Sequence, residues 1–327
     1  MEKIYGIKAL PGELHYPVAT LGVFDGVHRG HQKIIDRVRQ HAMEKKGESV
    51  VITFNRHPKT VIENRIPSFI TSLEHRLTLF DQMGVDYAVV LNFNRELAHM
   101  SAEDFIHEIL VDWLGVKCVI LGFDCRFGKN RKGDITLVRK LSDKYGFEVY
   151  ECPPVFHNNQ IISSTAIRQA ILEGALERAE EMLGRPVSIL GTVVRRSGRG
   201  RTLGYPTANV HPHHEVRPPR GVYGTKIHWA DKEYLALTNI GLRPTFTKEP
   251  LVSEDGDLEI EVHILDFQDS LYGKDIEVQF LFKIRDEISF KTETELKTQI
   301  ERDKEIFLKK VLTDNLPKDN GNTLNIG

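Results

Sequence analysis

Two histidines close together in the chain are the first candidates for chemistry. His28 and His31 end the run Gly22–His31, GVFDGVHRGH, where an apolar stretch gives way to a helical pattern. A helix start offers free N–H groups and a positive dipole to phosphate, and two imidazoles there can donate to phosphate oxygens as charge develops in a transition state. Gly30 would let the backbone approach such a ligand closely. The alternative is an ordinary turn with two surface histidines, and a zinc site is disfavoured because H-E-x-x-H is absent.

A second candidate phosphate site is the segment ISSTAIR, residues 162–168. Ser164 and Thr165 are expected at a helix start, where hydroxyls and N–H groups are available to phosphate. Arg168 follows one turn later on the same face and adds a forked cation. Taken alone, the segment fits an ordinary N-cap with a solvated arginine better. Together with the two histidines, it favours a phosphate site.

The second half of the chain carries GRGRTLGYPTAN, residues 198–209. Its glycines and arginines make a cationic loop suited to phosphate, although it is neither a Walker loop nor a G-x-G-x-x-G fingerprint. Thr207 and Asn209 present oxygens on one side of an extended strand, as a hard cation prefers. Further on, Glu259 and Glu261 share one face of a predicted strand, and the residues alone do not choose between them. A basic surface turn and a solvated strand face are the alternatives.

The elements of the first half predict a parallel sheet that would gather these residues. Apolar runs at 18–24, 49–54, 87–91, 118–122 and 148–152 alternate with helical patterns at 31–46, 71–84, 101–115, 134–145 and 163–183, the last interrupted at Gly174. The box Thr71–Glu74 is expected to cap the second helix. Strands separated by helices indicate a Rossmann-like α/β domain, whose ligands bind outside the carboxyl ends of the strands. The segments 25–31, 55–58 and 123–133 should therefore converge.

The second half predicts a different architecture. Strand-like runs at 188–194, 221–229, 234–239, 258–266 and 276–284 follow one another without a helix, which indicates a small antiparallel β-barrel. A capping box at 292–295 then opens a terminal helix whose apolar face holds Leu296, Ile300, Phe307 and Val311. We expect domains at 1–184 and 185–313, with a polar tail at 314–327.

The composition excludes several classes of protein. The chain has 327 residues, 40% hydrophobic and 28% charged, and its 44 basic and 46 acidic residues give a net charge of −2. This near-neutral balance argues against nucleic acid or a membrane as the main partner. The three cysteines form no C-x-x-C, which disfavours a disulfide framework or a closed zinc site and fits the cytoplasm. The sequence shows no signal peptide and no run long enough to span a bilayer.

In its motifs, the chain resembles the H-x-G-H nucleotidyltransferases, and specifically the bacterial bifunctional riboflavin kinase/FAD synthetases. The resemblance extends from about Tyr5 to about Phe307. The family's segments T-F-x-P-H-P, G-x-[DN]-F-x-F-G and S-S-T-x-x-R resemble residues 53–58, 122–128 and 163–168. Its kinase segments R-G-x-x-L-G-[FY]-P-T-A-N, N-I-G-x-R-P-T-F and E-x-H resemble residues 199–209, 239–246 and 261–263.

The resemblance implies an activity for each domain. The first would transfer AMP from ATP to FMN, giving FAD and pyrophosphate, and the second would phosphorylate riboflavin with Mg-ATP, giving FMN and ADP. It implies catalytic roles for His28, His31, Arg168 and Glu261, with Glu261 as general base. It implies ATP contacts at Gly22, Phe24, Asp25, Gly30, Ser164, Thr165, Gly198, Arg201, Gly204, Thr207 and Asn209. It implies flavin contacts at Asn55, His57, Pro58, Asp124 and Arg126, and Mg²⁺ at Thr207 and Asn209.

Two positions depart from the family pattern. Asn55–Arg56 stands where the family has an acid and a proline, and Cys125 replaces an aromatic residue. Either change could weaken adenylylation, which leaves a non-enzymatic flavin-binding first domain as an alternative. A dinucleotide-dependent oxidoreductase is disfavoured because Gly22, Gly26 and Gly30 are spaced four apart and do not fit G-x-G-x-x-G. A nucleic-acid binder is disfavoured by the neutral charge.

Overall fold

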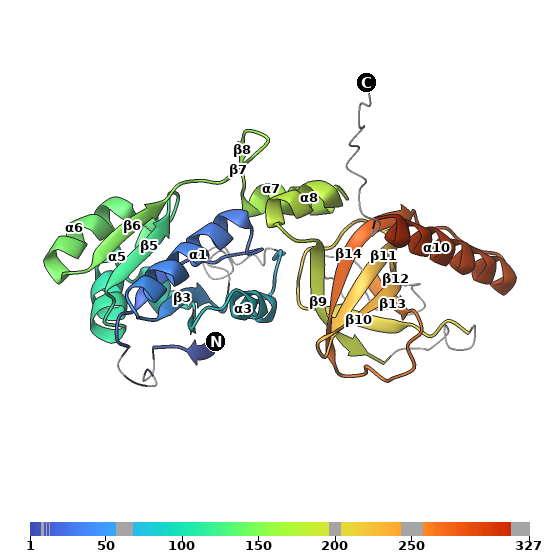
Figure 1. Ribbon diagram of the computed structural model, residues 1–327, viewed down its shortest axis with the longest axis horizontal. Helices are drawn as coiled ribbons and strands as arrows, with labels where there is room; N and C mark the ends of the chain where they lie inside the picture. The colour runs from blue at the N-terminus through green and yellow to red at the C-terminus, as the bar shows by residue number, and fades with distance from the viewer. Residues whose placement is uncertain are drawn as a thin grey trace, which may run out of the picture. The chain divides into compact units, whose positions relative to one another are not determined.

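The computed structural model describes residues 1–7, 10, 12, 14–56, 68–195, 204–242 and 258–314 (Figure 1). The chain forms two compact units. The first comprises Met1–Pro186 together with the short segment His214–Arg217, and the second comprises Val187–His213 together with Pro218–Gly327.

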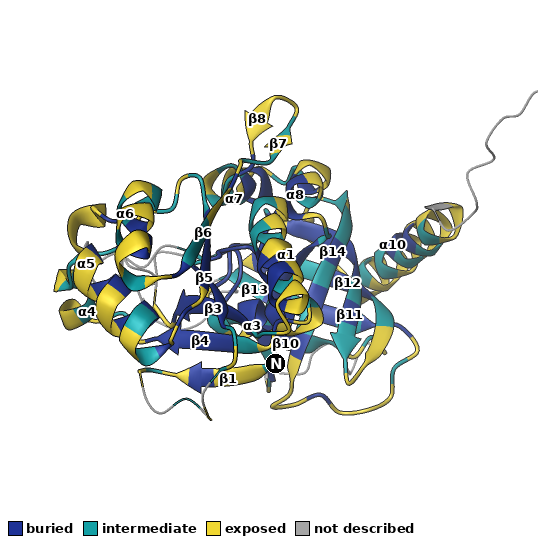
Figure 2. Ribbon diagram, turned by 60° about the vertical axis from the view of Figure 1, so that its left-hand side comes forward, coloured by how far each residue is buried: buried dark blue, intermediate teal, exposed yellow. Residues whose placement is uncertain are grey.

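The first unit is built on a parallel six-stranded sheet in the order β1-β4-β3-β2-β5-β6. The strands are β1 (Glu2–Tyr5), β2 (Val18–Leu21), β3 (Ser49–Phe54), β4 (Tyr87–Leu91), β5 (Cys118–Gly122) and β6 (Glu148–Cys152). Every residue of β2 and β3 is buried, because helices cover both faces of the sheet, and Figure 2 draws β3 and β4 largely in the buried colour. The predicted α/β architecture is confirmed. β2 is shorter than expected because the turn begins at Gly22, and β1 was not predicted.

Helices cover both faces of this sheet. They are α1 (Arg29–Glu44), α3 (Leu73–Gln82), α4 (Arg95–His99), α5 (Ala102–Asp104), a π-helix η1 (Phe105–Trp113), a 3₁₀ turn η2 (Lys129–Arg131), α6 (Ile135–Tyr145), α7 (Ser164–Leu172) and α8 (Leu176–Leu183). Apolar residues of η1 and α6 pack on one face, and those of α1 and α3 on the other. Gly174 adopts φ +76° between α7 and α8, so the interruption predicted there is a left-handed turn. A hairpin of β7 (Phe156–His157) and β8 (Gln160–Ile161) precedes α7.

The predicted cap of the second helix was wrong by one residue. Ser72, not Thr71, is the N-cap of α3, and its hydroxyl accepts from the His75 amide at 3.2 Å. The third helical position is therefore occupied by His75 and not by Glu74, so no capping box forms there. Thr71 has a long-range role instead, because its Oγ1 accepts from the Gly26 amide at 2.8 Å.

The second unit is a closed antiparallel barrel in the order β10-β13-β12-β11-β14-β9, as the sequence predicts in outline. Its strands are β9 (Val187–Val194), β10 (Ala208–Pro212), β11 (Gly221–Trp229), β12 (Lys232–Leu242), β13 (Leu258–Ile264) and β14 (Asp275–Arg285). The terminal helix α10 (Glu293–Asp314) buries Phe307 against Phe282 and the bare backbone of Gly224, where a Cβ would collide. Thr292 Oγ1 accepts from the Glu295 amide at 3.2 Å, which is one half of the predicted capping box, whereas the Glu295 carboxylate accepts from the Lys291 amide at 2.9 Å, one residue earlier than the box requires.

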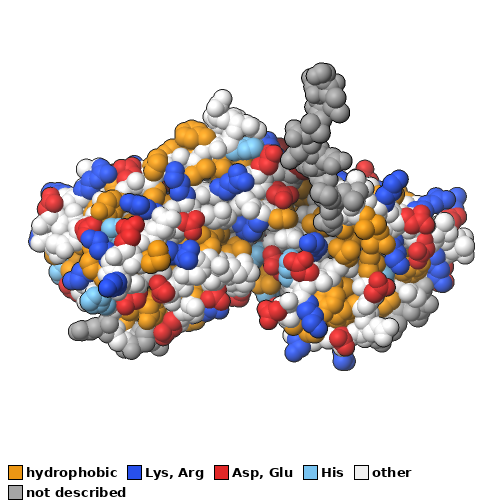
Figure 3. Space-filling view, viewed as in Figure 1, with side chains coloured by type: hydrophobic (Ala, Val, Ile, Leu, Met, Phe, Trp, Pro, Cys, Tyr) orange, Lys and Arg blue, Asp and Glu red, His pale blue; other side chains and the backbone are white. Residues whose placement is uncertain are grey.

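Charges of both signs are interspersed over the face shown in Figure 3, in keeping with the net charge of −2. Among the described residues, no helix combines the length and apolar character needed to cross a membrane.

Candidate active sites

The turn after β2 brings His28 and His31 into direct contact. His28 is the N-cap of α1, and its Nδ1 accepts from the His31 amide at 3.3 Å. The two rings stack with their centroids 3.6 Å apart and an angle of 19° between their planes. Gly30 makes this possible, because a Cβ there would lie 3.1 Å from the His28 ring. The turn also needs left-handed backbone at Phe24, Gly26 and Val27.

The electrostatic setting keeps both imidazoles uncharged at neutral pH. Burial, and then the Arg185 cation, lower the pKa of His28 to about 4. Desolvation, and then His28 and Arg76, lower the pKa of His31 well below its usual value. A neutral imidazole still offers one N–H donor. His31 Nδ1 is buried without a hydrogen-bond partner in the described part of the chain, so a ligand oxygen could supply one.

Side chains from four parts of the first unit hold the carbonyl groups of this turn. All four donate to backbone oxygens of residues 23–27. They are Arg76 to Val23, Ser164 to Asp25 at 3.0 Å, Arg185 to Gly26 at 2.9 Å and to Val27 at 3.2 Å, and Gln32 to Val27 at 2.8 Å. Because these bonds reach across the fold, the conformation of the turn is set by tertiary structure as well as by its own glycines.

Asp25 and Arg168 form a pair at the centre of the site. An Arg168 Nη2 donates to Asp25 Oδ2 at 2.7 Å, while Asp25 Oδ1 accepts from the Ile70 and Thr71 amides at 2.8 and 3.2 Å. Burial raises the pKa of Asp25, and the Arg168 cation and the two amides act in the opposite direction. Arg168 also donates to the Ser68 carbonyl at 2.9 Å. The structure therefore joins two predicted ATP-site residues to each other and ties α7 to the turn.

Two further residues of this region were not predicted from the sequence. Arg76 is 1% exposed, and it donates to Val23, Phe54 and Thr53 at the carboxyl ends of β2 and β3. Glu215, from the segment 214–217, accepts from the Ser72 amide at 2.6 Å and contacts His75 Nδ1 at 3.0 Å. Neither residue stands in a recognisable motif, so only the three-dimensional structure identifies them.

Other predicted residues lie in the same turn or at the start of α7. Phe24 is buried, and its ring meets His31 edge-on with the centroids 5.2 Å apart. A Cβ at Gly22 would lie 3.2 Å from the Phe24 ring, which leaves little room for a side chain there. Thr165 is exposed in the first turn of α7, whose N-cap is Ser163. Of these three positions, only Thr165 is exposed.

The predicted flavin residues follow β3 and β5, which flank β2 in the sheet. The Asn55 amide group donates to Asn92 at 3.0 Å and accepts from the Phe93 amide at 3.1 Å, so it braces the loop after β4. Asp124 and Arg126 are exposed after β5. Cys125 packs against the apolar core of the sheet, and burial raises the pKa of its thiol to about 12. His57 and Pro58 lie outside the described residues.

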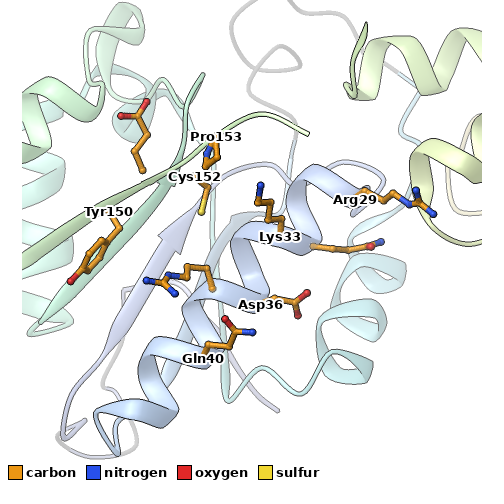
Figure 4. A pocket seen from close by; sticks show the side chains of 10 residues that line it. Arg29, Lys33, Asp36, Gln40, Tyr150, Cys152 and Pro153 are labelled. Carbon is orange, nitrogen blue, oxygen red and sulfur yellow. The ribbon is translucent and has the colours of Figure 1, made fainter. Parts of the chain in front are cut away.

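A cavity of about 590 Å³ in the first unit does not coincide with this site (Figure 4). It lies along the outer face of α1 beside β6, lined by Arg29, Lys33, Asp36, Gln40, Tyr150 and Cys152, among others. Arg29 adjoins His28 in sequence, but none of the predicted site residues lines the cavity. The candidate site is therefore defined by its polar contacts and by the edge of the sheet.

In the barrel, the strand register brings Asn209 and Glu261 side by side. Asn209 of β10 pairs with Glu261 of β13, which in turn pairs with Asn239 of β12, so the three form a row across one face. Asn209 is buried, and its Oδ1 has no hydrogen-bond partner in the described part of the chain. Thr207 lies directly before β10, two residues from Asn209. A buried amide oxygen without a hydrogen-bond partner, such as Asn209 Oδ1, suits a hard cation.

The segment before β10 is fixed by two other side chains. His263 Nδ1 lies 2.9 Å from the Pro206 carbonyl oxygen, and the Tyr205 hydroxyl donates to Glu301 of α10 at 2.6 Å. Gly204 takes a left-handed φ of +84° where this segment begins. The histidine of the E-x-H motif thus positions the backbone next to Thr207. Gly198 and Arg201 lie outside the described residues.

Comparison with known proteins places the two units in two enzyme classes. Residues 11–166 match the family model described as FAD synthetase, and residues 183–311 match the one described as riboflavin kinase. Curated relatives carry both together. A bifunctional riboflavin kinase/FMN adenylyltransferase of Buchnera aphidicola is 35% identical, over 94% of this chain and 98% of its own length. Its counterpart in Escherichia coli K12 is 37% identical, over 88% and 90%. The chain belongs to the family of bifunctional riboflavin kinase/FMN adenylyltransferases.

A solved structure shares the fold. The crystal structure of a protein described as a macrolide-efflux protein from Streptococcus pneumoniae is 32% identical to this chain, with a TM-score of 0.78. It covers 94% of this chain and 99% of its own.

Proposed function

We propose that the chain makes FAD from riboflavin in two ATP-dependent steps. The barrel unit transfers the terminal phosphoryl group of ATP to the ribityl 5′-hydroxyl of riboflavin, giving FMN and ADP. The parallel-sheet unit transfers AMP from ATP to FMN, giving FAD and pyrophosphate. One observation carries the proposal: this chain of the family holds both sets of residues. The first unit has the stacked His28–His31 pair at a helix start, and the barrel has Asn209 and Glu261 paired on neighbouring strands.

In the first unit, a phosphate oxygen of FMN attacks the α-phosphorus, and the bond to the leaving pyrophosphate breaks. Neutral His28 and His31 donate to the oxygens on which charge builds, and the start of α1 adds its dipole. Arg168 acts with Asp25 to fix α7 against the turn, so that the backbone amides of Ser164 and Thr165 and the Thr165 hydroxyl face the phosphates, while the Ser164 hydroxyl holds the Asp25 carbonyl. The flavin lies against the loops after β3 and β5, near Asn55, Asp124 and Arg126.

In the second unit, Glu261 accepts the proton of the ribityl hydroxyl as its oxygen attacks the γ-phosphorus. Asn209 and Thr207 supply oxygen donors that fit Mg²⁺, since the buried Asn209 Oδ1 has no partner in the described part of the chain. The ion, when bound, neutralises phosphate charge. The three free cysteines support a reducing compartment, and we infer the cytoplasm.

Chromatographic separation of riboflavin, FMN and FAD tests both steps in one preparation. With riboflavin and Mg-ATP, the wild-type chain should form FMN and FAD. Glu261→Gln should abolish FMN formation but still convert added FMN to FAD. His28→Gln should show the reverse pattern, and each variant is thus the folding control for the other. No product from the wild-type chain, with oxidised or dithionite-reduced flavin, would refute the proposal.

A further inference from the structure

Three potential metal ligands meet at the edge of the parallel sheet opposite to the histidine turn. Cys118 and Glu148 are the first residues of β5 and β6 and pair with each other across these strands, level with Val18 at the start of β2. His41, from the last turn of α1, lies beside them. One ligand atom of each residue lies within 4.8 Å of the other two, and His41 Nε2 is 3.4 Å from Glu148 Oε2.

The hydrogen bonding of His41 is unusual for a histidine packed in a protein interior. The residue is 5% exposed, and its Nε2 has no hydrogen-bond partner among the described residues although it faces a carboxylate. A buried polar atom normally finds a partner, and one that does not calls for an explanation. A metal ion between the imidazole and the carboxylate would give this nitrogen a bond.

We propose that His41, Cys118 and Glu148 bind one zinc ion, or a transition-metal ion of similar preference such as Co²⁺. Imidazole nitrogen, thiolate sulfur and carboxylate oxygen are the three donor types that zinc takes in proteins. A tetrahedral ion with bonds of about 2.0–2.3 Å holds its donors roughly 3.3–3.7 Å apart, so the separations in the present cluster need to shorten by up to about 1.5 Å. The fourth position would remain for water.

Neighbouring groups orient the carboxylate. Glu148 accepts from the Tyr16 hydroxyl at 2.7 Å, from Lys45 at 3.0 Å and from the Tyr150 hydroxyl at 2.8 Å. These bonds lower the pKa of Glu148 to about 2, so it is an anion at any ordinary pH. Such outer contacts are typical of metal-binding carboxylates. Lys45 offsets part of the negative charge, so the ligand set remains stable without the ion.

The thiol must lose its proton on binding. Burial raises the pKa of Cys118 to about 12, so the metal-free site holds a thiol. Metal binding breaks the S–H bond, forms the metal–sulfur bond and releases one proton to solvent, with no change of oxidation state. An entry path exists, because the Glu148 side chain is 37% exposed and its partner Tyr150 lines the cavity in Figure 4.

Cobalt is the sharpest probe, since a cobalt–thiolate bond gives a charge-transfer band in the near ultraviolet. We would strip the full-length chain of metal, titrate it with Co²⁺ and record this band. Wild type should bind one equivalent with the band, and Zn²⁺ should remove it. The oxygen donors proposed for Mg²⁺ in the barrel cannot give the band, so the two sites are distinguished.

Matched variants make the test specific. Cys118→Ser should lose the band, whereas Cys152→Ser, which removes another cysteine of the same core cluster, should keep it. His41→Gln leaves the thiol in place and should weaken cobalt binding at least tenfold. FMN and FAD formation by each variant reports its folding. The proposal is overturned if wild type shows no band, if Cys118→Ser retains it, or if His41→Gln binds as wild type does.

Discussion

The pairing of Asp25 with Arg168 predicts a measurable coupling between two residues 143 positions apart. Asp25 is 4% exposed and Arg168 25% exposed, with 2.7 Å between the bonded atoms. Asp25→Asn keeps an oxygen for the Ile70 and Thr71 amides but removes the charge. A hydrogen bond between charged groups is worth about 1.5–3 kcal/mol, and the partial exposure of Arg168 points to about 2 kcal/mol. That is roughly a 30-fold change in an equilibrium constant.

The two tryptophans of the chain allow each unit to be followed separately. Trp113 lies in the first unit and Trp229 in the second. In a Trp229→Phe background, urea unfolding reported by Trp113 gives the stability of the first unit. A double-mutant cycle with Asp25→Asn, Arg168→Gln and both together then isolates the pair energy. The same variants in a Trp113→Phe background should leave the Trp229 transition unchanged.

A coupling energy below about 0.5 kcal/mol would refute the reasoning, because it would place the pair with ordinary surface salt bridges. A shift of the Trp229 transition equal to that of Trp113 would refute it as well. Both single variants should also lower FAD formation from FMN while FMN formation from riboflavin stays at the wild-type rate.

Three further predictions concern the same unit. Since burial lowers the pKa of His28 to about 4 from about 6.5 in an unfolded chain, its contribution to stability is present above pH 6.5, and about 3 kcal/mol is lost as the pH falls to 4. His28→Asn, which retains a capping oxygen, should show a smaller loss in urea unfolding. Gly30→Ala should lower FAD formation about tenfold or more by displacing the His28 ring, although alanine is the better helix former. Glu215→Ala should destabilise the first unit by about 2–4 kcal/mol, because two buried donors lose their acceptor, and Glu215→Gln should cost less.

Each of these has an outcome that contradicts it. Equal acid sensitivity of His28→Asn and wild type would show that His28 titrates freely in the folded state. Full FAD formation by Gly30→Ala would mean that the ring position is not needed. An unchanged Trp113 transition in Glu215→Ala would mean that the segment 214–217 adds nothing to the first unit.

The sequence predicts most of the sheet because strands buried on both faces appear as continuous apolar runs. The bounds of β3, β4, β5 and β6 agree with the expected ranges. β1 was not predicted, and β10 was expected only as an extended stretch around Thr207 and Asn209, for a physical reason. β1 has the exposed pattern of an edge strand, EKIY, and β10 is short and ends in proline. In both, tertiary pairing decides the conformation, and the local pattern does not show it.

The site was predictable only where its residues stand together in the chain. The histidine turn is a local motif that the sequence shows, although α1 begins at Arg29 with His28 as its N-cap, two residues before the predicted start. By contrast, Arg76 is an isolated arginine within an ordinary helical pattern, and the sequence does not indicate that it is buried. A buried guanidinium is costly unless its donors are satisfied, and the ends of β2 and β3 supply these acceptors.

The contacts of Arg168 change how its expected role must work. The sequence predicts a guanidinium that is free to bind phosphate. In the structure, Arg168 Nη2 donates to the Asp25 carboxylate and Arg168 Nε donates to the Ser68 carbonyl. A phosphate that replaced Asp25 as the partner of Arg168 would leave the buried Asp25 carboxylate without its cation, at a cost of about 3–5 kcal/mol. Our proposal therefore keeps the Asp25–Arg168 pair closed when ATP binds and leaves the phosphates to other groups of the turn, such as His31 Nδ1, which is buried and has no partner in the described chain. On this argument Arg168 is a positioning residue, and Arg168→Lys should impair FAD formation almost as strongly as Arg168→Gln, because a lysine cannot donate to Asp25 and Ser68 with the same fork. If Arg168→Lys instead restored most of the activity, charge alone would suffice, and direct contact with phosphate would be the better account.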